Sequence, residues 1–286
     1  MRTTRSRAAL AAALAVTALA GLAGCAGDSA ATTPAAASTA LPLVTPGTLT
    51  VATDATYAPM ESMQGSEFVG ADIDLVKDLA QRMGLEVVFV QTGFDDLIDT
   101  VSAHRADLIA SSMTDRAARQ EKVDFVDYFI AGSQAIAAGG NPLGLDGPGT
   151  WCGHRAAVNS GTTNGDLVAA QSALCTQAGK APIVVDEVPN GQSAAEVEAG
   201  RADFGVEDYP SAADLVAASN GKTALAGKPL QPSPYGFGIA KDRTALRDAV
   251  QRALQESIAS GRYAEVLKAH GVEAAALTTT ALNGGA

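Results

Sequence analysis

The sequence predicts an α/β fold made of two units of similar plan. Short apolar or β-branched strands alternate with amphipathic helices over residues 48–110, and the same alternation returns over residues 155–204. The hexapeptide Ala-His-Arg-Ala-Asp-Leu at 103–108 is echoed by Ala-Gly-Arg-Ala-Asp-Phe at 199–204, and both end a helix and open a strand. Because alternating strands and helices favour a parallel sheet covered by helices, we expect two such α/β units.

The first unit is predicted to open with a β-branched strand over residues 48–53. Residues 71–83 place Leu75, Leu79 and Met83 on one helical face, and Gly84 supplies the C-terminal stop. A strand over residues 86–90, a helix over 95–103 and a strand over 108–110 follow.

The second unit is predicted as a strand over 155–158, a helix over 165–178 and a strand over 183–185. Asn141-Pro142 and the proline-rich segment 229–234 interrupt the chain where the two units are expected to join. Residues 235–240 then return to a strand. Leu246, Val250 and Leu254 mark a long helix that ends near Gly261, and residues 263–269 form a last short helix.

The N-terminus carries a secretory signal. Arg2, Arg5 and Arg7 precede an uncharged apolar segment, residues 8–23, which is too short to span a membrane comfortably. Leu-Ala-Gly followed by Cys25 resembles the lipobox of bacterial lipoproteins, which implies cleavage after residue 24 and a lipid on Cys25. An ordinary signal peptide with a chance cysteine is the alternative. We expect an extracytoplasmic protein attached to the cell membrane only through this lipid.

Composition limits the classes of partner. The formal charge of −11 and the pI near 4.7 argue against nucleic acid and against a polybasic membrane patch. Residues 25–46 are nearly all small or polar, so we expect a flexible linker there. No cofactor is predicted, and we expect a monomer.

Two cysteines remain if Cys25 is lipidated. In an oxidising compartment an even pair favours a disulfide, here between Cys152 and Cys175. A metal site formed by both cysteines and His154 is the rival interpretation, although it offers few ligands at zinc-like spacing.

Polar and aromatic residues follow the predicted strands, where open α/β sheets bind ligands. A guanidinium and a helix N-terminus suit a carboxylate, an aspartate suits an ammonium group, and aromatic faces favour a cationic side chain. These groups together predict a site for a free amino acid. The candidate ligand-binding residues are Asp54, Tyr57, Phe94, Ser111, Ser112, Thr114, Arg119, Asn159, Thr162, Thr163 and Asp208.

Each candidate also has a structural explanation when taken alone. Arg119 could lie on a solvated helical face, and Asp208 could cap the next helix. Tyr57 and Phe94 could belong to the core. Catalysis is not indicated, because the sequence has no Gly-x-Ser-x-Gly turn, no His-Glu-x-x-His helix and no glycine-rich phosphate loop.

Several stretches resemble the polar amino acid-binding proteins of ABC importers, and the resemblance extends over about residues 47–272. They are GTLTVATDATYAPME at 47–61, Val-Gly-Ala-Asp-Ile-Asp-Leu at 69–75, the block at 106–125 and Arg-Ala-Asp at 201–203. The resemblance implies a type II periplasmic-binding-protein fold, in which two hinge strands join two α/β lobes. Lobe 1 would comprise residues 47–134 and 232–274, lobe 2 residues 135–231, and residues 275–286 a loose tail.

The resemblance also implies roles for individual residues. Arg119 matches the arginine that grips the ligand α-carboxylate, with backbone amides near Thr114 and Thr163 helping. Asp208 matches the aspartate that takes the α-ammonium, with help at Ser112. The matches to Asp54, Tyr57, Phe94 and Ser111 line the side-chain pocket.

The ligand class stays open at this point. Aspartate and an aromatic residue at the matches to Asp54 and Tyr57 recur in binders of cationic amino acids and of glutamine. Asn159 stands where some glutamine binders carry lysine. We therefore expect a receptor that captures a polar L-amino acid, with the cationic ones among the candidates, and delivers it to an ABC permease. The alternatives are an enzyme of the cyclohexadienyl dehydratase kind on the same fold, or a ligand sensor for a signalling partner.

Overall fold

The structure is a computed structural model that describes residues 41–286. The predicted signal peptide, Cys25 and most of the predicted linker lie outside the described residues. None of the helices in residues 41–286 combines the length and apolar character needed to cross a membrane.

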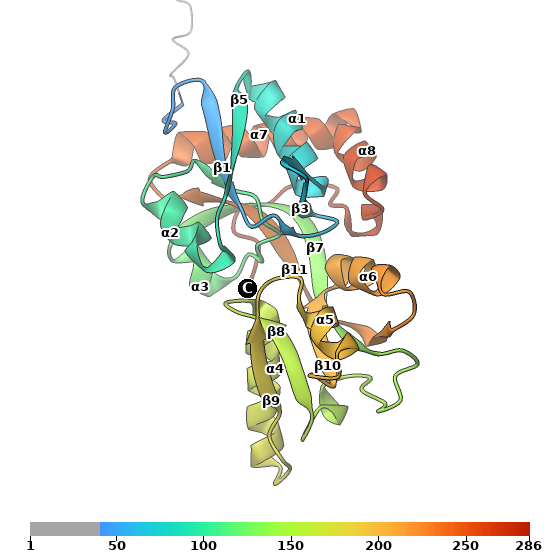
Figure 1. The fold of residues 1–286 in the computed structure, drawn as a ribbon. Helices are drawn as coiled ribbons and strands as arrows, with labels where there is room; N and C mark the ends of the chain where they lie inside the picture. The colour runs from blue at the N-terminus through green and yellow to red at the C-terminus, as the bar shows by residue number, and fades with distance from the viewer. Residues whose placement is uncertain (1–40) are drawn as a thin grey trace, which may run out of the picture. The chain divides into compact units, whose positions relative to one another are not determined.

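An eight-stranded mixed sheet runs through the described part of the chain, in the order β5-β1-β6-β11-β7-β10-β8-β9. Its strands are β1 (Thr48–Thr53), β5 (Glu86–Gln91), β6 (Leu108–Ile109), β7 (Val123–Ala138), β8 (Arg155–Asn159), β9 (Val184–Val188), β10 (Phe204–Asp208) and β11 (Thr223–Ala240). Parallel strands β5, β1 and β6 form one group, and parallel strands β10, β8 and β9 form the other. We call them the first and second half-sheets, and Figure 1 shows them above and below the middle of the ribbon.

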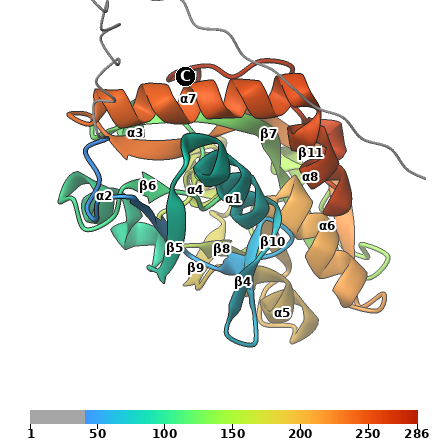
Figure 2. The same ribbon diagram turned by 90° about the horizontal axis from the view of Figure 1, so that it is seen from above.

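Helices and a small sheet complete the fold. The α-helices are α1 (Ala71–Met83), α2 (Leu97–Ser102), α3 (Ala117–Gln120), α4 (Thr163–Gln177), α5 (Ser193–Glu198), α6 (Tyr209–Ala218), α7 (Thr244–Ser260) and α8 (Arg262–Ala269). Short 3-10 turns are η1 (Phe94–Asp96), η2 (Pro148–Thr150) and η3 (Glu273–Ala275). A three-stranded antiparallel sheet consists of β2 (Thr56–Tyr57), β3 (Glu61–Gln64) and β4 (Glu67–Val69). In Figure 2 the long helix α7 lies beside α1 and α8.

Two long antiparallel strands connect the half-sheets. β7 pairs with β11 along nearly its whole length, and the pairing has register shifts between Ala226 and Leu230, between Leu230 and Ser233, and between Tyr235 and Gly236. Prolines in this stretch cannot donate to the ladder, and bulges accommodate them. Residues 141–142, which we expected at the junction, instead follow the end of β7 in a turn. The two proline segments therefore lie in different settings, residues 229–234 within β11 and residues 141–142 after the end of β7.

Each half-sheet has its own hydrophobic core. The larger core packs β1, β6, β7 and β11 against α1, α7 and α8. The second core centres on Trp151, which is fully buried and stacks on Phe204 with ring centroids 4.9 Å apart. The predicted disulfide between Cys152 and Cys175 is present, with a Cα–Cα distance of 5.5 Å, and it joins the turn after Trp151 to α4. Because both sulfur atoms are in this bond, the rival metal site is ruled out.

Both ends of the described chain are better ordered than the sequence indicated. We expected a flexible linker to residue 46, but Leu41 and Leu43 pack against the larger core, and the amide of Val44 donates to Asp107. We also expected a loose tail from residue 275. Instead the tail runs beside β7, where Leu282 packs on the core and the Gly284 amide donates to Asp127. The small residues around these leucines hid this order, and part of it comes from backbone amides that donate to side chains elsewhere in the fold.

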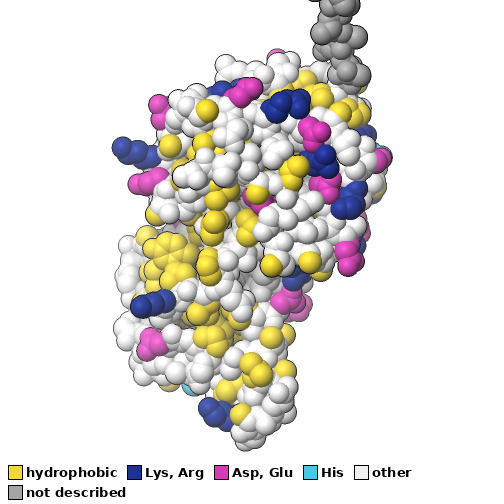
Figure 3. Space-filling view, turned by 180° about the vertical axis from the view of Figure 1, so that it is seen from behind, with side chains coloured by type: hydrophobic (Ala, Val, Ile, Leu, Met, Phe, Trp, Pro, Cys, Tyr) yellow, Lys and Arg dark blue, Asp and Glu magenta, His cyan; other side chains and the backbone are white. Residues whose placement is uncertain are grey.

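The structure bears out most of the predicted elements. The strand at 48–53 and the helix at 71–83 are found at the predicted bounds, and the repeated hexapeptide does link α2 to β6 and α5 to β10. Figure 3 shows that Lys and Arg on the rear face are interspersed with Asp and Glu and do not gather in a basic stripe.

Candidate ligand-binding site

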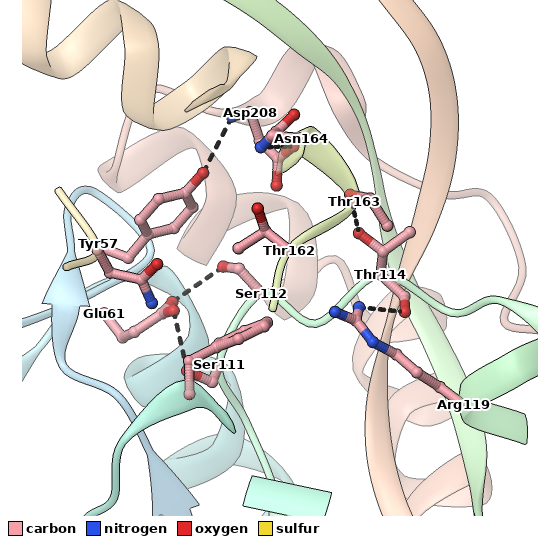
Figure 4. A pocket seen from close by; sticks show the side chains of 12 residues that line it. Tyr57, Glu61, Ser111, Ser112, Thr114, Arg119, Thr162, Thr163, Asn164 and Asp208 are labelled. Atoms are coloured by element: carbon pink, nitrogen blue, oxygen red, sulfur yellow. Dashed lines mark hydrogen bonds between the residues drawn. The ribbon is translucent and has the colours of Figure 1, made fainter. Parts of the chain in front are cut away.

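A pocket lies where the carboxyl ends of strands from both half-sheets meet, as the sheet rule predicts. It leaves about 320 Å³ free of protein atoms, part of it open to solvent. Twelve residues line it, and Figure 4 shows their arrangement: Tyr57, Glu61, Phe94, Ser111, Ser112, Thr114, Arg119, Thr162, Thr163, Asn164, Asn190 and Asp208.

Arg119 provides the buried cation of the pocket. Its side chain comes from α3 and is only 6% exposed. Two carbonyl oxygens accept hydrogen bonds from it, that of Thr114 at 2.9 Å and that of Gly161 at 3.0 Å, and its guanidinium carbon lies 5.4 Å from the centroid of the Phe94 ring. No carboxylate of the described residues lies within 4.0 Å of this guanidinium. Burial lowers the pKa of Arg119 to about 10, which still leaves it charged at neutral pH.

The N-terminus of α4 lies beside this cation. Thr162 caps the helix, since its hydroxyl accepts from the Gly165 amide at 3.2 Å. Thr163 lies 3.4 Å from the hydroxyl of Thr114, between their Oγ1 atoms. Free backbone N–H groups and the positive end of the helix dipole favour an anion at this place. Arg119 and α4 therefore make one electropositive corner.

Asp208 provides a buried anion at another wall of the pocket (Figure 4). It ends β10 and precedes α6. Its carboxylate accepts hydrogen bonds from the Tyr235 hydroxyl at 2.6 Å and from Asn164 Nδ2 at 3.1 Å, while its own amide donates to the Tyr57 hydroxyl at 2.9 Å. Burial raises the pKa of Asp208, against the lowering effect of these hydrogen bonds and of Arg119. No cation of the described residues is within 4.0 Å of its carboxylate.

Glu61 lies at the side of the pocket opposite Arg119, and Asp72 is a second carboxylate that neighbours Glu61 without lining the pocket. Gly70 makes their approach possible, because it has a φ of 130° and a Cβ there would overlap the carbonyl oxygen of Met60. The Gly-x-Asp-Ile-Asp-Leu motif thereby brings Asp72, in the first turn of α1, under Glu61 at the start of β3. Glu61 is 1% exposed and Asp72 is fully buried.

Ser112 connects these two carboxylates. Its hydroxyl donates to Glu61 at 2.9 Å and its backbone amide donates to Asp72 at 2.9 Å. Ser112 has a φ of 45°, an unusual conformation for a serine, and the two carboxylates hold it there. The neighbouring Ser111 hydroxyl lies 3.3 Å from the other oxygen of Glu61. Burial raises the pKa of both Glu61 and Asp72, and the proximity of the two carboxyl groups adds to the effect on Glu61.

The structure brings together nine of the eleven predicted site residues as pocket lining. Asp54 is at the rim, where its carboxylate accepts from the Phe94 amide and from Asn190 Nδ2, so it holds the two half-sheets' loops together. Asn159 does not line the pocket. It is buried behind it, and its amide donates to Glu207 at 2.6 Å. The position of Asn159 at a strand end correctly predicted that it lies near the pocket, but it did not predict the direction of its side chain.

Sequence reasoning missed Glu61, Asn164 and Asn190. Glu61 begins a strand, so the rule about strand ends did not select it. The sequence feature that could have identified Glu61 is its place as a carboxylate between Met60 and the Gly-x-Asp motif. Asn164 follows the two threonines at the start of α4, and Asn190 follows β9 in a turn, where nothing but polarity marked it.

Comparison with known proteins assigns the family. Residues 49–273 match the sequence profile of the bacterial extracellular solute-binding proteins, family 3. The chain belongs to this family. Its fold is the type II periplasmic-binding-protein fold that the resemblance implied.

Individual relatives and solved structures are consistent with this family. The arginine-binding protein of Corynebacterium glutamicum is 28% identical over 240 residues, which covers 83% of this chain and 78% of that protein. Two structures of ancestral arginine-binding proteins, one bound to arginine and one to glutamine, are each 28% identical. They superpose with TM-scores of 0.72 and 0.73, over 79% and 80% of this chain and 98% and 100% of theirs. The ancestral amino acid-binding protein AncCDT-1, described as a precursor of cyclohexadienyl dehydratase, is 30% identical with a TM-score of 0.69, over 78% of this chain and 95% of its own.

Proposed function

We propose that this protein is the solute receptor of an ABC importer, that it binds an L-amino acid with a cationic side chain, and that it breaks no bond in its ligand. One observation carries this: Arg119 and Asp208 are buried opposite charges in one pocket, and neither is paired with a charged partner in residues 41–286. A buried charge without a partner is costly, and an α-amino acid supplies both partners at once.

The pocket assigns each ligand group a place. The α-carboxylate would meet Arg119 and the N-terminus of α4, and the α-ammonium would meet the carboxylate of Asp208. Tyr57 and Phe94 would flank the ligand side chain, whose end would reach Glu61. A cationic end fits best, because two carboxylates without a cation lie there.

Binding would be coupled to closure of the two lobes. Polar contacts from one half-sheet to the other surround the pocket, including Asn190 to Asp54 at 3.0 Å and Arg119 to the Gly161 carbonyl. We propose that β7 and β11 are the hinge strands and that a ligand between the lobes favours the closed population. The closed lobes would then present the ligand to a membrane permease.

Location forms part of the same proposal. A lipid on Cys25 and the residues that follow it would hold a monomeric receptor at the outer face of the membrane. Such a tether raises the receptor's effective concentration near its permease.

A thermal-shift screen of all common L-amino acids, with ornithine and citrulline added, tests the function. A ligand that binds only the folded state raises the melting temperature with its concentration. We expect the largest shifts from arginine, lysine, ornithine or histidine. Shifts confined to acidic amino acids would overturn the proposed ligand class. Turnover of prephenate or arogenate by the same sample would overturn the receptor in favour of an enzyme.

A further inference from the structure

Glu61 and Asp72 form a buried acidic pair without a cation. Neither makes an ion pair with any Lys, Arg or His in residues 41–286, and both are almost completely shielded from water. They share Ser112 as a hydrogen-bond donor, and two neighbouring carboxylates that are shielded from water cannot both be ionised without a large cost. One of them must keep a proton while the pocket is empty.

The hydrogen bonds indicate which carboxyl holds the proton. Oδ2 of Asp72 accepts from two donors, the Ser112 amide at 2.9 Å and the Tyr128 hydroxyl at 2.6 Å, and this stabilises a negative charge. Glu61 contacts the hydroxyls of Ser111 and Ser112, and a hydroxyl can accept a hydrogen bond as well as donate one. Glu61 can therefore be neutral with all its partners kept.

The other ionisable groups around the pair supply no positive charge that would allow both carboxyl groups to ionise. Asp54, beyond β1, adds negative charge that raises the pKa of Glu61 further, and Tyr128 on β7 is a neutral donor whose pKa burial raises well above its usual value. Tyr57 on β2 is neutral for the same reason. Arg119 and Asp208, the two buried charges proposed to bind the α-carboxylate and α-ammonium groups, are not in contact with the pair.

We propose that the empty pocket stores a proton on the Glu61–Asp72 pair, and that the cationic side chain of a ligand expels this proton when it binds. The inference deepens the proposed function and rests on it for the identity of the cation. The O–H bond of Glu61 breaks, the proton passes to water or buffer, and the ligand's guanidinium or ammonium group replaces its positive charge. A neutral side chain leaves the proton in place.

Two consequences follow. Because ligand and proton compete for one site, affinity for a cationic amino acid rises with pH by up to about tenfold per unit until the empty pair has lost its proton. Affinity for citrulline, the uncharged analogue of arginine, stays constant over the same range. The pair thus selects for side-chain charge.

Infrared spectroscopy of the ligand-free protein tests the stored proton without any ligand. At neutral pH we expect carbonyl stretching bands of protonated, buried carboxyl groups, to which Glu207 also contributes, and we expect one component to be lost in Glu61→Gln and kept in Glu67→Gln. Glu67 is the matched control, since it is exposed on the adjoining strand β4. Asp72→Asn serves as a second variant if Glu61→Gln does not fold. Identical carbonyl bands in the wild-type protein and in Glu61→Gln overturn the proposal.

Calorimetry in buffers of different ionisation enthalpy tests the expulsion. We expect close to one proton released per arginine bound to wild-type protein or Glu67→Gln, and none for citrulline or for arginine bound to Glu61→Gln. Arginine binding to wild-type protein with no proton release overturns the expulsion while leaving the receptor function intact. If no cationic amino acid binds, the proposed ligand class fails and the expulsion with it, whereas the infrared band still reports whether the proton is stored.

Discussion

At one end of the pocket Arg119 and Asp208 each carry a single buried charge of opposite sign, whereas at the other end Glu61 and Asp72 are two buried carboxylates without a cation. The first end draws on both half-sheets, because Arg119 comes from α3 and Asp208 from β10. The second end comes only from the first half of the chain. We call the Arg119–Asp208 end the balanced end and the Glu61–Asp72 end the unbalanced end. Balanced charges suit the zwitterionic part common to all amino acids, and unbalanced charge suits only some side chains.

This difference separates two tasks. A ligand can contact both charges of the balanced end only when the two half-sheets are close to each other. Binding of any amino acid there is therefore coupled to closure of the lobes. Selection at the unbalanced end needs no movement, since β3, α1 and the loop after β6 already hold the carboxylates in place. We therefore expect substitutions at the two ends to have different effects on affinity and on selectivity.

The largest effect is expected at the balanced end, from Arg119→Gln. It leaves the ligand α-carboxylate buried and uncompensated, which costs about 3–5 kcal/mol, or roughly 150- to 4,000-fold in Kd. The loss applies equally to arginine, citrulline and glutamine, as calorimetric titration can show. Arg155→Gln is the control, because Arg155 is an exposed residue of β8 paired with Asp186. Selective loss of only one ligand would contradict the assigned role.

A smaller and selective effect is expected at the unbalanced end, from Glu61→Gln. A hydrogen bond to a charged group contributes about 1.5–3 kcal/mol, so arginine affinity falls roughly 10- to 100-fold. Citrulline affinity changes by less than about threefold, since the neutral ligand loses no charge pairing. The ratio of the two dissociation constants is the readout, and an unchanged ratio would show that Glu61 does not sense side-chain charge.

The third prediction concerns how the free energy of unfolding depends on pH in the wild-type protein and in variants of its buried carboxyl groups. Burial raises the pKa of Glu207, behind Asp208, from 4.5 to about 7, and it raises the pKa of Glu61 and Asp72 as well. A carboxyl group with a raised pKa binds its proton more tightly in the folded state. The unfolding free energy of the ligand-free protein therefore falls as pH rises from about 4.5 through 7. Denaturant titrations should show a shallower fall in Glu61→Gln and in Glu207→Gln, and no change of slope in Arg155→Gln.

The smallest effect is expected outside the pocket, at the ion pair of Arg116 with Asp166. This pair joins the start of α3 to α4, but both side chains are partly exposed to solvent. Exposed pairs contribute about 0.2–1 kcal/mol, so Arg116→Gln should weaken every ligand by less than about fivefold. An effect as large as that of Arg119→Gln would mean that closure, and not ligand pairing, governs affinity.

Local sequence patterns predicted the fold better than the site. The β1 and α1 bounds follow from β-branched residues and from the spacing of Leu75 and Leu79, with Gly84 as the stop. β11 was predicted only over its last residues, because its prolines conceal a strand that bulges around them. The tail beside β7 was missed because some of its contacts are made by the backbone amides of Gly284 and Gly285, which carry no sequence signal.

For the site, sequence patterns predicted which residues lie near the pocket but not which way their side chains point. Arg119 and Asp208 were predicted from their places after strands, and both line the pocket. Asn159 satisfied the same rule, yet its amide turns away to Glu207. Glu61 was missed because a short antiparallel strand, and not a parallel one, presents it.

The central claim is that one ligand satisfies both ends of the pocket, and calorimetric titration with arginine, agmatine and citrulline tests it most directly. Agmatine lacks the α-carboxylate of arginine and citrulline lacks its side-chain charge. We predict that arginine binds at least about tenfold more tightly than either, and that Arg119→Gln weakens arginine and citrulline but not agmatine. Agmatine binding as tight as that of arginine, or equal losses for all three ligands in Arg119→Gln, would contradict the account.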